Sequence, residues 1–207
     1  MVILKIKQNA MVAREDGAED YLKNCIKYIK YDRDHARVGA DGNVELPIRS
    51  DYICGHGFGV TYQDSKMCYE QMMTVKRMYG RERFNPVIHC IVSFNDIDDV
   101  GKCIEYCHGL ERWIGMELHH QCVWALHRQW IMINNRYRDK RMVYHCHILI
   151  NPVNYKTGLM MSVNRGLISR FVKMMNIMMD TYIEAYFDNT TSGQQFMIIG
   201  HRNRSKS

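Results

Sequence analysis

Tyr144-His145-Cys146-His147-Ile148-Leu149-Ile150-Asn151-Pro152 places two histidines two residues apart inside an apolar run. Alternate side chains of a β-strand share a face, so His145 and His147 are expected on one side, roughly 7 Å apart along the strand. The other face then carries the core residues Tyr144, Cys146, Ile148 and Ile150. Because a slip of one residue would bury the wrong set, this pattern fixes the register of the strand.

Two imidazoles on a rigid strand can chelate a divalent metal ion. One further ligand would leave coordination positions open for a substrate, as in a catalytic site. His-x-His pairs also occur as plainly hydrogen-bonded histidines, so spacing alone leaves both interpretations open.

Length and composition indicate one globular domain. At 207 residues the chain is long enough for one full core and short for two, so a single domain over residues 1–207 is expected. Hydrophobic residues at 46% and charged residues at 24% are ordinary, and no apolar run approaches the roughly 18 residues of a membrane span. Residues 1–7 lack the long apolar core of a signal peptide, so neither export nor a membrane is expected.

The eight cysteines are scattered singly without a Cys-x-x-Cys pair. Reduced, buried thiols are therefore expected rather than disulfides or a zinc site, as in a cytoplasmic protein. The formal charge of +6 and the pI near 8.9 favour a polyanionic partner, and nucleic acid is the leading candidate.

Hydrophobic periodicity predicts the order of the elements. Strands are expected at 2–8, 52–54, 87–94, 121–130, 142–151 and 195–199, with a loop at 34–50 and a glycine turn at 55–59. Helices are expected at 18–31, from Asp64 or Ser65 to Tyr79 before Gly80, after a cap at Asn95 or Asp96, and from Asn164 to Phe187. This irregular alternation favours an α+β fold, with a central antiparallel sheet and helices packed on it.

A hairpin argument selects a third ligand. If strands 124–133 and 142–151 pair around a loop centred near Tyr137, facing residues sum to about 274, and His127 lies opposite His147. Facing residues share a side with Cβ atoms about 5 Å apart, so three imidazoles would converge. His89, on the neighbouring strand, is the next contender as a ligand or as a partner of one. The histidines expected at the surface are His108, His119 and His120.

Several stretches together resemble the relaxase or mobilisation nucleases of the HUH endonuclease class, which begin conjugative DNA transfer. They are Ala18 to Ile29 with Tyr28-Ile29, Glu70 to Gly80, Ile88 to Phe94, and His145 to Asn154 followed by Thr157-Gly158. The resemblance implies an HUH relaxase-like fold and a bacterial, cytoplasmic protein. Relaxases of this kind often continue into further domains, so this chain could be the N-terminal nuclease part of a longer protein.

The resemblance also implies the site. An upstream histidine, carried to His127, joins His145 and His147 to bind a divalent metal, Mn²⁺ or Mg²⁺. A tyrosine near the N-terminus, carried to Tyr28, attacks one strand at a transfer origin and forms a 5′-phosphotyrosyl adduct. Tyr21 and Tyr31 lie in the same helix region and remain alternatives.

The chain departs from the family pattern. Family members often have an aspartate two residues after the first histidine and a short gap before the pair. Here Arg128 and Gln129 follow His127, and 17 residues separate it from His145. An extended hairpin would preserve the geometry.

Basic residues indicate how DNA is held. The candidates for phosphate contacts are Lys76, Arg77, Arg81 and Arg83 around the end of the second helix, and Arg136, Arg138, Lys140 and Arg141 near the hairpin tip. Solvated surface positions are the alternative for both groups. The expected partners are single-stranded DNA beside a hairpin or duplex at the origin, together with other relaxosome and coupling proteins.

Two other functions fit the same residues. One is a different HUH enzyme, either a replication initiator or a transposase, although the order of Tyr28 before the histidines favours a relaxase. The other is a non-catalytic nucleic-acid-binding module with a vestigial metal site. Formation of a covalent DNA adduct separates the enzymes from the module.

Overall fold

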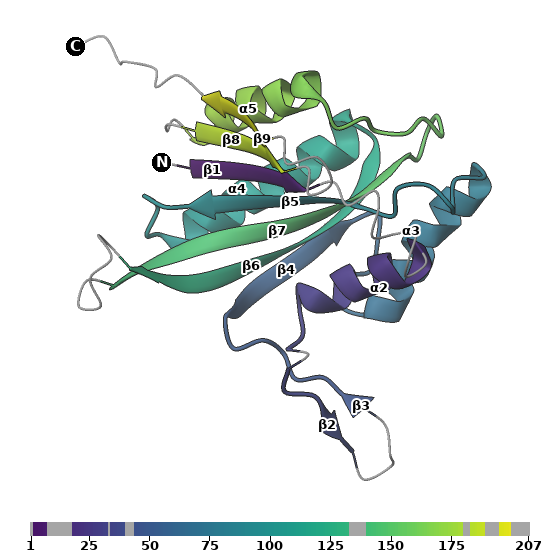
Figure 1. Cartoon of the computed structure of the whole chain (residues 1–207), viewed down its shortest axis with the longest axis horizontal. Helices are drawn as coiled ribbons and strands as arrows, with labels where there is room; N and C mark the ends of the chain where they lie inside the picture. Colours follow the sequence, from purple (N-terminus) through teal and green to yellow (C-terminus); the bar gives the residue numbers. More distant parts are fainter. Residues whose placement is uncertain are drawn as a thin grey trace.

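A seven-stranded sheet forms the centre of the computed structural model, which describes residues 2–7, 18–32, 34–39, 44–132, 140–179, 183–188 and 195–199 (Figure 1). Its strands run in the order β4-β6-β7-β5-β1-β8-β9. They are β1 (Val2–Lys7), β4 (Tyr52–Phe58), β5 (Ile88–Phe94), β6 (His120–Met132), β7 (Lys140–Asn154), β8 (Ile183–Asp188) and β9 (Gln195–Ile199). Every neighbouring pair is antiparallel except β1 and β8, which run parallel. The predicted α+β fold with an antiparallel sheet is confirmed.

Helices cover both faces of this sheet and enclose two cores. The helices are α2 (Ala18–Tyr28), α3 (Ser65–Met78), α4 (Val100–Arg112), the π-helical turn η1 (Trp113–Glu117) and α5 (Arg165–Met179). One core joins α4 and α5 to the face that carries Trp124, Cys146 and Ile148. The other joins α2 and α3, which lie side by side (Figure 1), to the face that carries Val123 and Leu149. The two faces follow the two-residue alternation of β6 and β7.

The β6–β7 hairpin has the predicted faces but a different register. His127 pairs with His145, not with His147, and Ala125 pairs with His147. Facing residues therefore sum to 272 instead of 274, because the ladder is centred one position before Tyr137. Since the difference is two residues, all three histidines remain on one face. Tyr137 itself, the expected centre of the loop, lies outside the described residues.

The glycine-rich segment after Tyr52 is strand, not turn. β4 continues to Phe58, with Gly55 and Gly57 on the face next to Tyr62 and Val60. A Cβ atom at either glycine would collide with those side chains, so the glycines give a close approach within a strand. The turn follows at Gly59, whose φ is +68°.

Residues 34–50 also differ from the expected loop. They contain the short strands β2 (Arg37–Val38) and β3 (Val44–Glu45), which pair with each other as a separate two-stranded ribbon that projects from the body of the structure (Figure 1). All four residues are exposed, so hydrophobic alternation could not reveal them.

Two helix boundaries correct the expectation from sequence. α4 begins at Val100 and is capped by Asp99, not by Asn95 or Asp96. The last helix ends at Met179, and the chain returns as β8 beside β1 instead of remaining helical to Phe187. Ile183 and Ala185 are fully buried in this strand. A short apolar run fits the period of a helix and that of a strand, and here pairing with β1 makes the segment a strand.

The eight cysteines are all free thiols, as predicted. Burial raises the pKa of Cys90 to about 12, so this thiol is protonated at neutral pH. Within the described residues, no helix is both long and apolar enough to cross a membrane.

Replacing Asp99 by Ala should destabilise the chain by about 1 kcal/mol, because the Asp99 Oδ1 accepts from the backbone N–H groups of Gly101 and Lys102 at 2.8 and 3.3 Å. Urea unfolding measures this free energy. Asp98→Ala is the matched control, because Asp98 is exposed and its ion pair with Arg141 lies at the surface. Equal losses in the two variants would contradict the cap.

Candidate metal centre and tyrosine site

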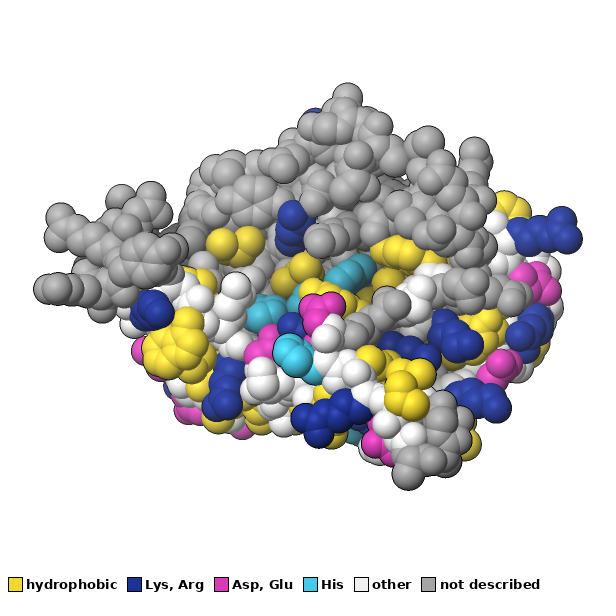
Figure 2. Space-filling model, turned by 60° about the horizontal axis from the view of Figure 1, so that its bottom comes forward, with side chains coloured by type: hydrophobic (Ala, Val, Ile, Leu, Met, Phe, Trp, Pro, Cys, Tyr) yellow, Lys and Arg dark blue, Asp and Glu magenta, His cyan; other side chains and the backbone are white. Residues whose placement is uncertain are grey.

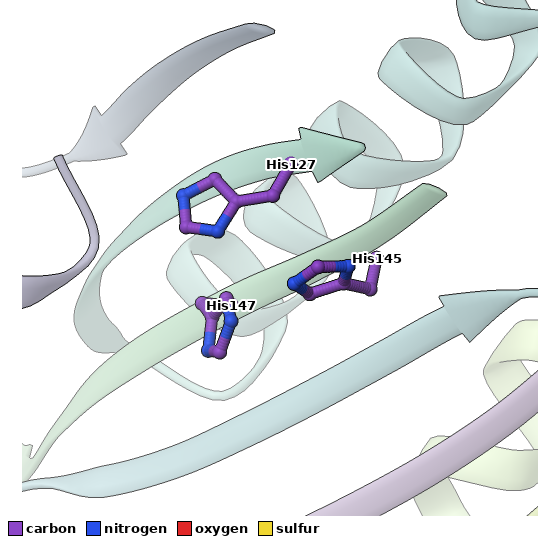
Figure 3. A group of neighbouring side chains, drawn as sticks. All are labelled: His127, His145 and His147. Carbon is purple, nitrogen blue, oxygen red and sulfur yellow. The ribbon is translucent and has the colours of Figure 1, made fainter. Parts of the chain in front are cut away.

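Three histidines converge on the face of the sheet that α2 and α3 cover. His127 comes from β6, and His145 and His147 come from β7 (Figure 3). One ring nitrogen of each lies within 4.8 Å of the others, and the ring centroids are 5.0 to 5.3 Å apart. The structure therefore brings together the three residues selected from sequence.

The tautomer of His127 is fixed by the backbone. Its Nε2–H donates to the carbonyl oxygen of Ile29 at 2.7 Å, which leaves a lone pair on Nδ1. The Nδ1 atoms of His127 and His145 are both buried without a hydrogen-bond partner. Orphaned buried nitrogens are costly, and a metal ion would satisfy them, so this donor set fits a divalent ion.

His89 orients one member of the triad. Its Nε2 lies 2.8 Å from Nδ1 of His147, and both residues are buried. This contact occupies the Nδ1 side of His147 and leaves Nε2 for an ion. The geometry thus places His89 behind a candidate ligand, the second of its two predicted roles.

Burial keeps the triad neutral. Desolvation lowers the pKa of His145 to about 4 and also lowers the pKa values of His127 and His147. Neighbouring imidazoles act in the same direction on His145 and His147. Neutral imidazole is the form that binds metal, so the site needs no proton loss at neutral pH.

Tyr28 lies beside this triad at the last position of α2. Its ring meets the ring of His147 edge to face, with centroids 5.7 Å apart, and the side chain is 44% exposed. Tyr21 instead packs against the core under α2 and α3. Tyr31 forms a β-bridge with Ile48. Of these three tyrosines, Tyr28 combines exposure with a ring contact to the triad.

Arg49 and Asp51 complete the site and were missed from sequence. The Arg49 guanidinium lies 5.1 Å from the Tyr28 ring centroid, and Asp51 holds it through two hydrogen bonds of 2.8 Å. The hydrogen bonds from Arg49 lower the pKa of Asp51, which His127 lowers further. Both residues lie in the segment before β4, where no periodic pattern marks them. An Arg-x-Asp spacing was the available signal.

The predicted DNA-binding residues are placed unevenly. Arg77 and Arg81 lie at or just beyond the end of α3, where Arg77 pairs with Glu70 at 3.2 Å. Lys140 and Arg141 begin β7, and Arg141 pairs with Asp98 at 2.9 Å. Arg136 and Arg138 fall outside the described residues.

Neighbouring Lys76 is no part of a phosphate patch. It is fully buried and donates to the carbonyl of Asn85 at 2.8 Å. Desolvation lowers its pKa to about 8. A buried position of α3 therefore carries a lysine, and its Nζ forms a hydrogen bond inside the protein instead of contacting solvent.

The two basic groups lie toward opposite ends of β7. Tyr79, next to the end of α3, donates to the carbonyl of Tyr155 just past β7, whereas Lys140 begins that strand. His147 is seven residues from Asn154, or ~23 Å along an extended chain. In Figure 2, Lys and Arg side chains (dark blue) lie around a central group of histidines (cyan).

The arrangement combines three elements of phosphate chemistry. It offers neutral nitrogen ligands for a cation, an exposed phenol in ring contact with one of them, and a fixed guanidinium against the phenol ring. A cation and a guanidinium together stabilise a phosphodiester anion and the further negative charge that develops in its transition state.

A family model described as "Relaxase: MobA/VirD2-like, nuclease domain" matches residues 49–183, which are 135 of the 207 residues. The matched range includes the three histidines, His89, Arg49 and Asp51, and begins after Tyr28. No curated protein and no solved structure matches the chain.

In the presence of a chelator, the free energy of unfolding should fall by on the order of 2 kcal/mol between pH 7 and pH 5 on account of His145. The folded pKa of His145, about 4, lies below its ordinary value of 6.5. The unfolded chain therefore binds more protons between these values, and stability is lost as the pH falls. Urea unfolding at several pH values measures the slope.

The difference between the unchanged chain and His145→Gln isolates this contribution from the other histidines. A variant with the same slope as the unchanged chain would show that His145 is not held neutral in the folded state.

Proposed function

Because the chain belongs to the relaxase family of MobA/VirD2-like nuclease domains, we propose that it nicks one DNA strand at a transfer origin and so initiates conjugative transfer or mobilisation. At the family level the chain is a DNA-nicking nuclease that uses a divalent metal ion and binds single-stranded DNA. The proposal adds the residues, the covalent intermediate and the biological setting, a bacterial cytoplasm.

One observation carries the proposal. The exposed Tyr28 ring contacts the ring of His147, whose neighbours His127 and His145 point ring nitrogens at a common centre. A structural metal site would enclose its ion with four protein ligands. Three ligands beside an exposed phenol instead suit an ion that shares its coordination with a substrate phosphate.

His127, His145 and His147 would hold the ion through Nδ1 of His127 and Nε2 of His147, with His145 as the third donor. When bound, a divalent ion such as Mn²⁺ or Mg²⁺ neutralises the non-bridging oxygens of the scissile phosphate and orients them. Imidazole nitrogens do not by themselves choose between these and other divalent ions.

The phenol oxygen of Tyr28 then forms a bond to phosphorus while the bond from phosphorus to the 3′ oxygen breaks. The phenolic proton passes to water, to which Tyr28 is exposed, and the 3′ oxygen takes up a proton from water to become a hydroxyl. The product is a 5′-phosphotyrosyl adduct with a free 3′ end. Reversal of the same step rejoins the strand, so no nucleotide cofactor is needed.

Arg49 acts on both partners of this step. Its guanidinium lies against the Tyr28 ring and interacts electrostatically with the histidines. Asp51 fixes its orientation with two hydrogen bonds. A guanidinium held this way restricts the phenol and offers positive charge to the phosphate, and so supplies part of the orientation that catalysis requires.

The basic groups at the ends of β7 indicate where DNA would run. Lys140, Arg141 and the basic residues between the strands would contact one end of the substrate, and Arg77 and Arg81 the other. Trp130, which is 62% exposed on β6, could stack on an unpaired base near the first group. The proposed substrate is single-stranded DNA next to a hairpin or duplex, with other relaxosome and coupling proteins as partners.

Tyr28→Phe should reduce covalent adduct formation by at least about 1,000-fold, because it removes the attacking oxygen. Incubation with a pool of single-stranded DNA and Mn²⁺, followed by a denaturing gel and peptide mass mapping, measures the adduct. DNA affinity should be unchanged, since the ring remains.

Tyr31→Phe and Tyr21→Phe are the matched controls and should form adduct normally. An undiminished adduct in Tyr28→Phe would move the nucleophile to another residue, with Tyr31 first. Tight, salt-sensitive binding without adduct in the unchanged chain would instead favour a non-catalytic binding module.

His145→Ala should lower adduct formation at least about 100-fold, and a chelator should do the same to the unchanged chain. The variant loses one of the three ligands of the ion that would hold the phosphate, and the chelator removes the ion itself. His35→Ala is the control, because His35 is an exposed loop histidine paired with Asp32. Undiminished adduct formation by His145→Ala, or by the unchanged chain in chelator, would exclude the proposed metal role.

A further inference from the structure

A second cluster of metal-ligating side chains lies on the opposite face of the sheet. His56 in β4 pairs with Trp124 in β6, and Trp124 belongs to the core under α4. His108 and Glu111 come from α4 itself. His127 lies three residues from Trp124 along β6 and therefore points to the other side of the sheet. This cluster is thus separate from the histidine triad.

The ligand atoms of this cluster lie close to the spacing that coordination requires. Nδ1 of His56 is 2.8 Å from Oε1 of Glu111, and Nδ1 of His108 is 3.1 Å from Oε2. One ligand atom from each of the three residues lies within 4.8 Å of the others. Two ligand atoms on a tetrahedral ion with bonds of 2.0 to 2.1 Å are about 3.3 Å apart. Small shifts would therefore admit an ion.

Trp124 fixes the carboxylate in place. Its Nε1–H donates to Oε2 of Glu111 at 2.7 Å, and the Glu111 side chain is only 5% exposed. The rings of His108 and Trp124 meet edge to face, with centroids 5.1 Å apart. A buried carboxylate held by an indole N–H is the kind of outer contact that orients a metal ligand.

The two histidines keep the cluster open to solvent. Their side chains are 53% and 43% exposed, so an ion and its water ligands could enter without rearrangement of the core. Glu105 and Arg112 line the same cavity and bring one charge of each sign. The local charge before binding is therefore set by Glu111, a buried carboxylate that a divalent cation would neutralise.

We propose that His56, His108 and Glu111 form a second metal site, which takes Zn²⁺ or a similar late first-row divalent ion with water in its remaining positions. Two imidazoles and one carboxylate are a donor set that suits zinc. The bound ion links the edge strand β4 to α4, elements that lie far apart along the chain. It replaces the two hydrogen bonds between Nδ1 of each imidazole and the carboxylate, and each ring then carries its proton on Nε2.

Zinc stoichiometry tests the site directly. The chain is freed of metal with a chelator, equilibrated with Zn²⁺ and separated from free ion, and its zinc content is measured by elemental analysis. His56→Gln/His108→Gln should bind one zinc per chain fewer than the unchanged chain. The same deficit should appear in a His145→Gln/His147→Gln background, which makes the result independent of the triad.

His35→Gln is the matched control for non-specific binding of zinc at surface histidines. His35 Nδ1 also contacts a carboxylate at 2.8 Å, that of Asp32, but the structure offers no third ligand there among the described residues. Its zinc content should equal that of the unchanged chain. Equal zinc content in His56→Gln/His108→Gln and the unchanged chain would overturn the proposal.

A thermal measurement covers the case in which a variant folds poorly. In the His145→Gln/His147→Gln background, Zn²⁺ should raise the melting temperature, because the ion binds the folded chain. Glu111→Gln keeps an oxygen for Trp124 and removes the charge, so zinc affinity should fall at least about tenfold. A melting temperature insensitive to zinc in that background would also overturn the proposal.

Discussion

The two-residue alternation of the β6–β7 ladder is the constraint on which both candidate sites depend. It places His127, His145 and His147 on the face beneath α2 and α3, and Trp124 with its apolar neighbours on the face beneath α4. Both faces are covered by helices, so a slip of one residue would move the three histidines into the apolar core beneath α4 and carry Trp124 and its neighbours to the face beneath α2 and α3. The register that stabilises the fold is therefore the register that assembles the chemistry.

Much of this arrangement followed from periodicity. The His-x-His spacing predicted a shared face, and the length of the two strands predicted a hairpin that brings in His127. The predicted pairing partner of His127 was wrong by two residues, because the centre of a loop cannot be located to the residue from composition. The error left the faces unchanged, since it was two residues and not one.

Other features had no local signal. Arg49 lies over the Tyr28 ring and Asp51 interacts electrostatically with His127, and both contacts depend on how β4 enters the sheet. The end of α5 was misplaced because methionine and isoleucine satisfy helical and strand patterns equally, and pairing with β1 decides the outcome. Lys76 looked like a surface charge in sequence, although it is buried and donates to a carbonyl.

The bond from His127 to the carbonyl of Ile29 joins the triad to the residue directly after Tyr28. Its acceptor is a backbone atom, so no exchange of the side chain at position 29 removes it. Alanine at position 29 would leave the acceptor in place, and sequence drift at that position would preserve it. The distance between the Tyr28 phenol and the histidine triad is thus set by the main chain. Related chains could therefore keep this distance while sharing few of the surrounding side chains.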